Sequence, residues 1–304
     1  MRANRQSNGT NARRHGLTAC SAQREEVPMQ RLAAFAAVLL AGLFWLAGPA
    51  SAAATLESLH YRASYQGLFS AGARVRIADV ELHLRRPDAG APYLESELLA
   101  SSAAYGAVEA IHPIRYRLRS WFWPDRSGVL AAEYHEFGRP DDLEHKLFFL
   151  DDPEQAFVAH DLRKEGEGLL QRLRGGRYLA RVGMGQRRAF DRLGLVQAVR
   201  ARALAPGDRF EVPVSNGEKM LRYRVRVEKA ETLQLGGRRW PALKLRFDGL
   251  EQDERGRWKH AHRPVFLWLS RDDRHLPLLA EARAAVGRFR IELVEAPGTQ
   301  VALR

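Results

Sequence analysis

Cysteine is almost absent from this chain: its 304 residues include one, Cys20. A single cysteine can form no intramolecular disulfide, and the zinc sites that are built on thiolates need several. The sequence therefore excludes a disulfide framework and a cysteine-based metal site.

Long hydrophobic runs are equally scarce, and the clearest one lies near the N-terminus. Arg31 precedes an apolar run at residues 32–46, which is shorter than the roughly 20 residues of a membrane-spanning helix. The small residues of Gly48-Pro49-Ala50-Ser51-Ala52 follow it, as at a signal-peptidase site. This pattern predicts a secretory signal peptide that is cleaved between Ala52 and Ala53.

Cleavage there divides the chain into a signal peptide at residues 1–52 and a mature chain at residues 53–304. The polar residues 1–28 are either an extended leader or a mis-assigned start, and we expect Met29 to be the true initiator. Ala53 stands where a lipid-anchored precursor needs a cysteine, so we expect no lipid anchor. The mature protein is therefore predicted to be periplasmic or secreted, without a stable membrane span.

Acidic residues are in the minority. The chain has 36 of them against 48 lysines and arginines, which gives a formal charge of +12. Residues 1–52 hold six arginines and two glutamates, so the mature chain keeps +8. Such a surplus is compatible with a partner such as anionic lipid or envelope glycan. The basic residues are scattered singly, as on the solvated face of a sheet, and no basic run contains interleaved aromatics, so we predict no nucleic-acid partner.

Catalytic and cofactor signatures are lacking as well: no His-Glu-x-x-His, no Gly-x-Ser-x-Gly and no phosphate-binding glycine loop occurs. His260-Ala261-His262 places two imidazoles on one side of a strand, but no third ligand is spaced to join them. Two groups of acid and base side chains are interpreted as solvated loops: Glu133, His135 and Glu136, and Asp141, Asp142, Glu144 and His145. We predict no catalytic, metal-binding or cofactor-binding residues and no cofactor, and the question of enzymatic activity stays open, with the balance against it.

Most of the mature chain alternates between apolar and polar residues, which is the period of a half-buried β-strand. Residues 59–65 and 75–84 show this alternation, and a change of phase in the second segment predicts a bulge near Asp79 that keeps both parts on the buried side. Asn216-Gly217 and Gly236-Gly237 each separate two alternating segments. Both pairs predict hairpins, with a type I′ turn at Asn216-Gly217.

One segment has helical spacing instead. Within residues 191–204 the apolar residues follow intervals of three, three and four: Leu193, Val196, Val199 and Ala203. Asp191 is placed as the N-cap and Pro206-Gly207 as the stop. Arg200 lies on or beside the apolar stripe, where an unpaired charge is costly. Its partner is either a carboxylate of the sheet or an anionic ligand held bidentately, and we expect the carboxylate.

Residues 191–200 and Pro206-Gly207-Asp208 resemble the central motif of the exported bacterial proteins grouped as domain-of-unknown-function family 3108. The resemblance continues through a tryptophan strand, an Asp-containing turn and a proline, and it is best over residues 191–294. Gly194 stands where the family usually has Ser, and Gln197 stands where an aromatic residue is common. The resemblance implies no activity, because none is established for the family.

Four residues of the resembling segment are candidate structural or ligand-binding residues: Asp191, Arg200, Trp268 and Asp272. Asp272 is expected to serve its turn through side-chain bonds to the backbone. Outside this segment, Trp121 and Trp123 share one face of a predicted strand. They belong either to core or rim packing or to a platform for a sugar or a membrane interface.

These patterns predict an all-β protein, with a strongly curved antiparallel sheet or open barrel-like roll and one short helix on its concave side. Residues 53–304 are expected to form a single domain, in which the polar residues 151–185 are a long internal connection. We predict a non-enzymatic exported envelope protein that binds a lipid-like or glycan ligand, in a groove beside the helix, or supports envelope assembly. The alternatives are a hydrolase acting on an envelope polymer and a structural protein-interaction module.

Overall fold

A computed structural model of the chain describes residues 54–87, 91–137, 144–150, 160–166, 168, 189–217 and 219–296. The chain divides into two compact units, Met1–Ala50 and Ser51–Arg304, and the described residues all belong to the second. The predicted signal peptide with its Ala52/Ala53 cleavage site, and most of the polar residues 151–185, lie outside the described residues. In the part of the chain that is described, no helix has both the length and the apolar character needed to span a membrane.

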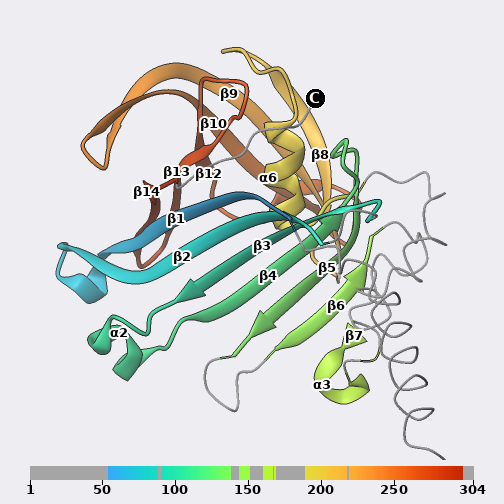
Figure 1. The fold of residues 1–304 in the computed structure, drawn as a ribbon, viewed down its shortest axis with the longest axis horizontal. Coiled ribbons are helices and arrows are strands. Elements are labelled where there is room, and N and C mark those ends of the chain that lie inside the picture. Colours follow the sequence, from blue (N-terminus) through green and yellow to red (C-terminus); the bar gives the residue numbers. More distant parts are fainter. Residues whose placement is uncertain are drawn as a thin grey trace, which may run out of the picture. The chain divides into compact units, whose positions relative to one another are not determined.

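One antiparallel sheet of 14 strands makes up most of the described chain (Figure 1). Its strands are β1 (Ala54–Gly67), β2 (Arg74–Arg86), β3 (Leu94–Ser101), β4 (Arg115–Phe122), β5 (Val129–Glu136), β6 (His145–Phe149), β7 (His160–Asp161), β8 (Arg209–Ser215), β9 (Met220–Leu235), β10 (Arg238–Gln252), β11 (Trp258–His260), β12 (Val265–Ser270), β13 (Pro277–Ala284) and β14 (Gly287–Glu295). The helical elements are η1 (Leu68–Ser70), α2 (Gly106–Ile111), α3 (Leu162–Glu165) and α6 (Arg192–Arg200). The all-β prediction is confirmed, and α6 is the predicted helix.

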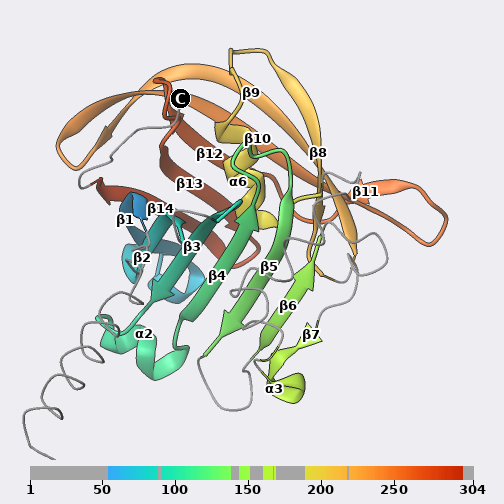
Figure 2. The same ribbon diagram turned by 45° about the vertical axis from the view of Figure 1, so that its right-hand side comes forward.

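The strand order is β7-β6-β5-β4-β3-β2-β1-β14-β13-β12-β10-β9-β8, and β11 pairs with β10 outside this path. Two meanders, β1–β7 and β8–β14, are therefore joined by the pairing of the first strand with the last. That pairing runs from His60 opposite Glu295 to Gly67 opposite Gly287. The first and the last strand in sequence, β1 and β14, therefore lie side by side in the middle of the strand order (Figure 2).

The sheet is open, as predicted, but a short segment bridges its two sides near α6. The backbone N–H of Val129, at the start of β5, donates to the carbonyl of Ala189 over 3.1 Å. The next residue, Phe190, donates to Pro213 of β8 over 3.1 Å and accepts from Ser215 over 2.7 Å. The segment before α6 therefore joins the first meander to the edge strand of the second by backbone hydrogen bonds.

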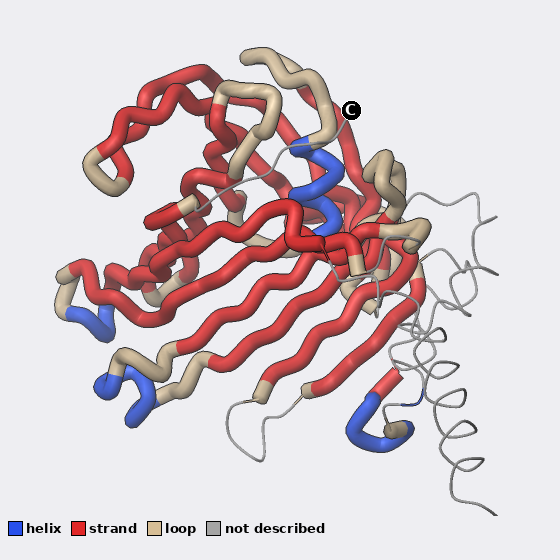
Figure 3. The backbone as a smooth tube through the Cα atoms, viewed as in Figure 1, coloured by secondary structure: helices blue, strands red, loops and turns tan. Residues whose placement is uncertain are grey.

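The sheet bends around α6, with β8–β10 on one side of the helix and β3–β6 on the other (Figure 3). The helix residues Leu195, Ala198 and Val199 belong to a buried cluster that includes Phe122 of β4 and Leu243 of β10. A separate cluster gathers Trp121, Leu130, Leu147, Phe149 and Leu162. The concave side is thus filled around the helix by side chains from both meanders.

The alternation of residues 59–65 is confirmed, since Leu59, Tyr61, Ala63 and Tyr65 are all buried. The predicted bulge exists, but it lies two positions before Asp79. Ala63 pairs with Ala78 and Ser64 pairs with Arg76, so Ile77 is the extra residue of β2. Val75 pairs with Tyr65 and Ala78 pairs with Ala63, so the bulge keeps both on the same face as predicted, although Val75, near the start of β2, is 39% exposed.

The two predicted hairpins differ in their turns. Gly236 and Gly237 have φ angles of +56° and +74°, and Leu235 pairs with Arg238, as a two-residue type I′ turn requires. The type I′ prediction at Asn216-Gly217 is wrong, because Gly217 has positive φ (+86°) but Asn216 does not. The side-chain oxygen of Asn216 accepts from the N–H of Lys219, and this bond replaces the expected turn geometry.

Candidate functional site

Asp191 caps the N-terminus of α6 from a buried position. Its carboxylate accepts from the backbone N–H groups of Leu193 (3.1 Å) and Gly194 (2.9 Å) and from the hydroxyl of Ser120 on β4 (2.7 Å). Burial raises the pKa of the Asp191 carboxyl above its usual range, although these hydrogen bonds lower it. The predicted N-cap is therefore confirmed, and the same carboxylate also links α6 to β4 by a hydrogen bond.

Arg200 is paired with a carboxylate of the sheet. Its Nη1 and Nη2 bond the two oxygens of Glu57 on β1 at 2.8 and 2.7 Å. Nη1 also bonds Gln197 (3.3 Å), Nη2 bonds the carbonyl of Arg274 (3.2 Å), and Nε bonds the carbonyl of His275 (3.0 Å). A guanidinium has five N–H donors, so none remains for an anionic ligand.

The helix ends at Arg200 rather than at the predicted Leu204. Nδ1 of His275 lies 3.0 Å from the carbonyl oxygen of Arg200, and the N–H of Arg202 bonds the carbonyl of Val199, three residues back. His275, in the turn before β13, therefore contacts the last helical carbonyl, which a further turn of the helix would otherwise satisfy.

The two departures from the family pattern have local explanations. A Cβ atom on Gly194 would lie 2.2 Å from Cγ2 of Val129 and 2.7 Å from an oxygen of Asp191, so only glycine fits against β5. Gln197 donates to the hydroxyl of Ser96 on β3 (3.2 Å) and accepts from Arg200. Both residues fix α6 against the sheet.

Asp272 lies in the turn that presents the two carbonyls to Arg200. Its carboxylate accepts from the hydroxyl of Ser270 (2.6 Å) and from Nη2 of Arg274 (3.0 Å). Asp272 therefore serves its turn through these side-chain partners as well as through the expected bond to the backbone, which comes from the N–H of Arg274. Because the same turn supplies carbonyl oxygens to Arg200, Asp272 supports the helix contact indirectly.

Trp268 borders a basic depression on the sheet that we call the basic groove. Its volume is about 380 Å³, and it is lined by Lys244, Arg263, Pro264, Phe266, Trp268, Glu281, Arg283 and Arg288. The indole N–H of Trp268 donates to Glu231 (2.6 Å). Nζ of Lys244 lies 4.4 Å from the ring centroid of Phe266 and 5.4 Å from that of Trp268. Cations and aromatic rings are thus interleaved along one wall.

The basic groove carries more positive than negative charge. Arg283 and Arg288 share one carboxylate, Glu281, at 3.5 and 3.6 Å, and Lys244 pairs with Glu228 at 3.0 Å. The guanidinium of Arg263 bonds the carbonyl of Ala284 (3.4 Å). Among the residues that line the basic groove, four are cations and one, Glu281, is a carboxylate, while Glu228 pairs with Lys244 and Glu231 accepts from Trp268.

A smaller cavity, of about 230 Å³, opens beside the N-terminus of α6 and is lined by Leu118, Tyr134, Phe148, Asp191 and Arg192 among others. The predicted groove beside the helix is reduced to this space, because buried side chains fill the concave side along α6.

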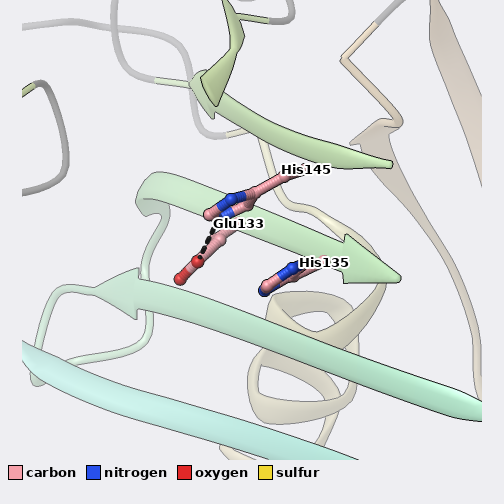
Figure 4. A group of neighbouring side chains, drawn as sticks. All are labelled: Glu133, His135 and His145. Atoms are coloured by element: carbon pink, nitrogen blue, oxygen red, sulfur yellow. Dashed lines mark hydrogen bonds and ion pairs between the residues drawn. The ribbon is translucent and has the colours of Figure 1, made fainter. Parts of the chain in front are cut away.

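The structure also gathers three residues that the sequence left apart: Glu133 and His135 of β5 and His145 of β6 (Figure 4). Nε2 of His145 lies 2.7 Å from one oxygen of Glu133, and Nη1 of Arg119 donates to the other over 3.2 Å. The two imidazole rings stack with centroids 4.0 Å apart. Burial and the nearby His145 lower the pKa of His135.

The interpretation of these side chains as members of solvated loops is therefore wrong. Glu133 and His145 are buried, at 2% and 8% exposure, and all three residues lie on paired strands. The available signal was a hairpin: Gly138 and Pro140 lie between two segments whose alternating positions include His135 and His145. Asp141 and Asp142 lie outside the described residues.

The remaining sequence candidates are dispersed. His260 is exposed on β11, whereas His262 contacts the hydroxyl of Tyr223 (2.9 Å) and the carbonyl of Arg263 (2.7 Å). Trp121 is fully buried, and Trp123 packs against the same cluster. Of the two alternatives for these tryptophans, packing in the core is confirmed.

The fold and its sites define an open antiparallel β-roll with a buried helix that is held by an ion pair. Residues 186–294, which include α6, β8–β13 and all but the last residue of β14, match the family described as protein of unknown function DUF3108. No functionally curated protein matches the chain significantly.

Three solved structures are similar over most of their length. A β-barrel-like protein of domain of unknown function DUF1849 from Brucella abortus is 8% identical, with a TM-score of 0.45, and the match covers 81% of this chain and 98% of that one. An exported protein with a YmcC-like fold from Bacteroides fragilis is 6% identical, with a TM-score of 0.33 and coverages of 81% and 97%. The hypothetical lipoprotein YmcC from Escherichia coli is 10% identical, with a TM-score of 0.29 and coverages of 90% and 98%.

Proposed function

We propose that the chain is an exported, non-enzymatic protein of the cell envelope that binds an acidic glycan in the basic groove. The observation that carries this proposal is the convergence of Lys244, Arg263, Arg283 and Arg288 beside two aromatic rings. Arginine forks suit the carboxylate, sulfate or phosphate groups of acidic sugars because they bond them bidentately. The predicted signal peptide supports an envelope location.

The size and lining of the basic groove favour a glycan over a lipid tail. Its volume of about 380 Å³ lies near the lower end of the roughly 300–1,000 Å³ that is usual for ligand sites. A buried acyl chain needs a lining without charges, whereas five of the eight residues that line this groove are charged. Sugar rings carry both polar groups and an apolar face, so they match a wall of mixed cations and aromatics.

The test compares binding of acidic and neutral sugars to the exported chain. We expect polygalacturonate oligomers to bind and neutral dextran oligomers not to bind, with affinity for the acidic oligomers falling as salt is added. Arg263→Glu should lower that affinity at least tenfold. The matched control is Arg163→Glu, because Arg163 is exposed on α3, beside β7 at the end of the strand order that is remote from the basic groove.

Two outcomes contradict the proposal. Equal losses from Arg263→Glu and Arg163→Glu would show that binding follows the net charge of the chain and not the basic groove. Binding to vesicles of phosphatidylglycerol, together with no binding to the acidic oligomers, would show that the ligand is a lipid surface instead.

A further inference from the structure

The cluster of Glu133, His135 and His145 has the geometry of a ligand set. Glu133 and His135 are two residues apart on β5, so their side chains share one face of the sheet, and His145 pairs directly with His135 across the strands. The nearest nitrogen and oxygen atoms of the three side chains all lie within 4.8 Å of one another. Metal bonds of about 2.0–2.2 Å place such atoms about 3.4 Å apart, so the atoms of His145 and Glu133, now 2.7 Å apart, must separate slightly and the more distant ligand atom must approach them.

Two further observations point to a ligand at this place. Nδ1 of His135 is buried and has no hydrogen-bond partner. A buried polar atom of this kind calls for an explanation, and a missing ion is one of them. The second oxygen of Glu133 is held by Arg119, which is itself bonded to Glu97 over 2.8 Å. Such outer partners orient the ligands of metal sites.

We propose that Glu133, His135 and His145 bind one divalent transition-metal ion of the class of Zn²⁺. Two imidazole nitrogens and one carboxylate oxygen suit zinc and its neighbours, whereas Mg²⁺ and Ca²⁺ prefer sets made of oxygen alone. Three protein ligands leave the fourth position of a tetrahedral ion open to water or to a ligand.

Binding requires a defined rearrangement. The imidazoles of His135 and His145 stack with an interplanar angle of 11°, whereas a metal lies in the plane of each imidazole that binds it. His135 therefore turns out of the stack, and the bond between His145 and Glu133 gives way to two bonds to the ion. The charge of Arg119 opposes the ion, and Glu97 offsets only part of it because the same carboxylate also pairs with Arg85 and Arg117.

The test uses the exported chain, purified without a polyhistidine tag and stripped with a chelator. We expect one Zn²⁺ per chain by elemental analysis after dialysis, a higher melting temperature with Zn²⁺, and the visible absorption of tetrahedral Co²⁺ on substitution. His135→Gln should weaken Zn²⁺ binding at least tenfold and remove the Co²⁺ absorption. It is preferred to variants of the more buried Glu133 and His145, because it leaves their hydrogen bond in place.

The matched control is His260→Gln, which removes an exposed imidazole from β11 and should leave Zn²⁺ affinity unchanged. The proposal is overturned if the chain retains no Zn²⁺ after dialysis. It is also overturned if folded His135→Gln protein, checked by circular dichroism, binds Zn²⁺ as tightly as the unmodified chain.

Discussion

The guanidinium of Arg200 and the carboxylate of Glu57 form a bidentate pair across 143 residues of sequence. Arg200 lies within residues 186–294, which match the family, whereas Glu57 lies outside them. Ser96 and Ser120, the other sheet partners of the helix, also lie outside. The matching segment therefore depends on the first meander to satisfy its buried polar groups.

Arg200→Ala should strongly destabilise the fold, because it leaves the buried carboxylate of Glu57 unpaired. Losing one partner of a buried pair costs about 3–5 kcal/mol of unfolding free energy. Urea unfolding monitored by tryptophan fluorescence measures this loss. Arg200→Lys should give an intermediate loss, because an ammonium cannot reproduce the fork of bonds to Glu57 and the turn.

The control for this variant is Arg226→Ala, which removes an exposed arginine and should change stability by less than about 0.5 kcal/mol. In the double variant Arg200→Ala/Glu57→Ala, the losses should be less than additive, because the second change removes the orphaned charge. An Arg200→Ala protein as stable as the unmodified chain would contradict the structural role.

Asp191→Ala should remove about 1–2 kcal/mol through the lost helix cap, and more because the buried hydroxyl of Ser120 loses its acceptor. Asp191→Asn should cost less than Asp191→Ala, although its amide nitrogen would face one of the two backbone N–H groups that the carboxylate oxygens now accept. Asparagine is an equally good N-cap, and burial already raises the pKa of the Asp191 carboxyl by penalising its charge. Equal losses from both variants, measured as unfolding free energies in urea, would show that the negative charge itself is required.

Gly194→Ala should destabilise the chain, although alanine favours helices over glycine by about 1 kcal/mol. The added methyl would overlap Val129, and overpacking of this kind costs about 1–3 kcal/mol. Val129→Ala removes the methyl group that is overlapped. We therefore expect the double variant to be at least about 0.5 kcal/mol more stable than the sum of the single losses predicts, and simple additivity would refute the packing explanation.

Glu97 should make the fold sensitive to acid. Burial raises the pKa of its carboxyl, but the hydrogen bond from Arg119 and the charges of Arg119, Arg85 and Arg117 together lower that pKa below 4.5. A carboxyl with a depressed pKa in the folded state adds stability that is complete above its unfolded value and is lost as pH falls through the folded value. The urea midpoint should therefore fall as the pH drops from about 5 to 3.

Glu97→Gln should be less stable than the unmodified chain at neutral pH and should show a shallower decline in that acidic range. Glu254→Gln changes an exposed glutamate and serves as the control, with the pH dependence of the unmodified chain expected. Parallel declines for the chain and Glu97→Gln would show that other carboxyls cause the acid sensitivity.

Local patterns were sufficient to predict the elements whose contacts are short-range. Alternation identified β1, and the N-cap Asp191 identified the start of α6, because capping and strand periodicity depend on neighbours in sequence. The need of Arg200 for a partner also followed from its position on an apolar stripe. Its identity did not, because Glu57 is brought to it by the register of β1, which no local signal encodes.

The predictions that were wrong share one cause: they depend on contacts with residues that are distant in sequence. The helix stops early because His275 bonds its last carbonyl from 75 residues away. The cluster of Glu133, His135 and His145 depends on the register of β5 against β6, where a shift of one residue would move His145 to the other face of the sheet. From the sequence alone, these charged side chains were expected to be solvated. In the sheet, Glu133 is buried and lies directly opposite Arg119 of β4.

Because β1 pairs with β14, the strand order of this open sheet is a circular permutation of a single meander. From β7 down to β1 and then from β14 down to β8, each strand on the path lies beside its predecessor in a descending series. A permuted chain that began at Ala189, ran through β14 and continued by a linker into Ala54 would build nearly the same sheet from consecutive hairpins. Such a chain would replace the longest-range pairing with a local one, and folding rates rise as contacts become more local. The natural order of the segments therefore delays the joining of the two meanders until both ends of the domain have been made.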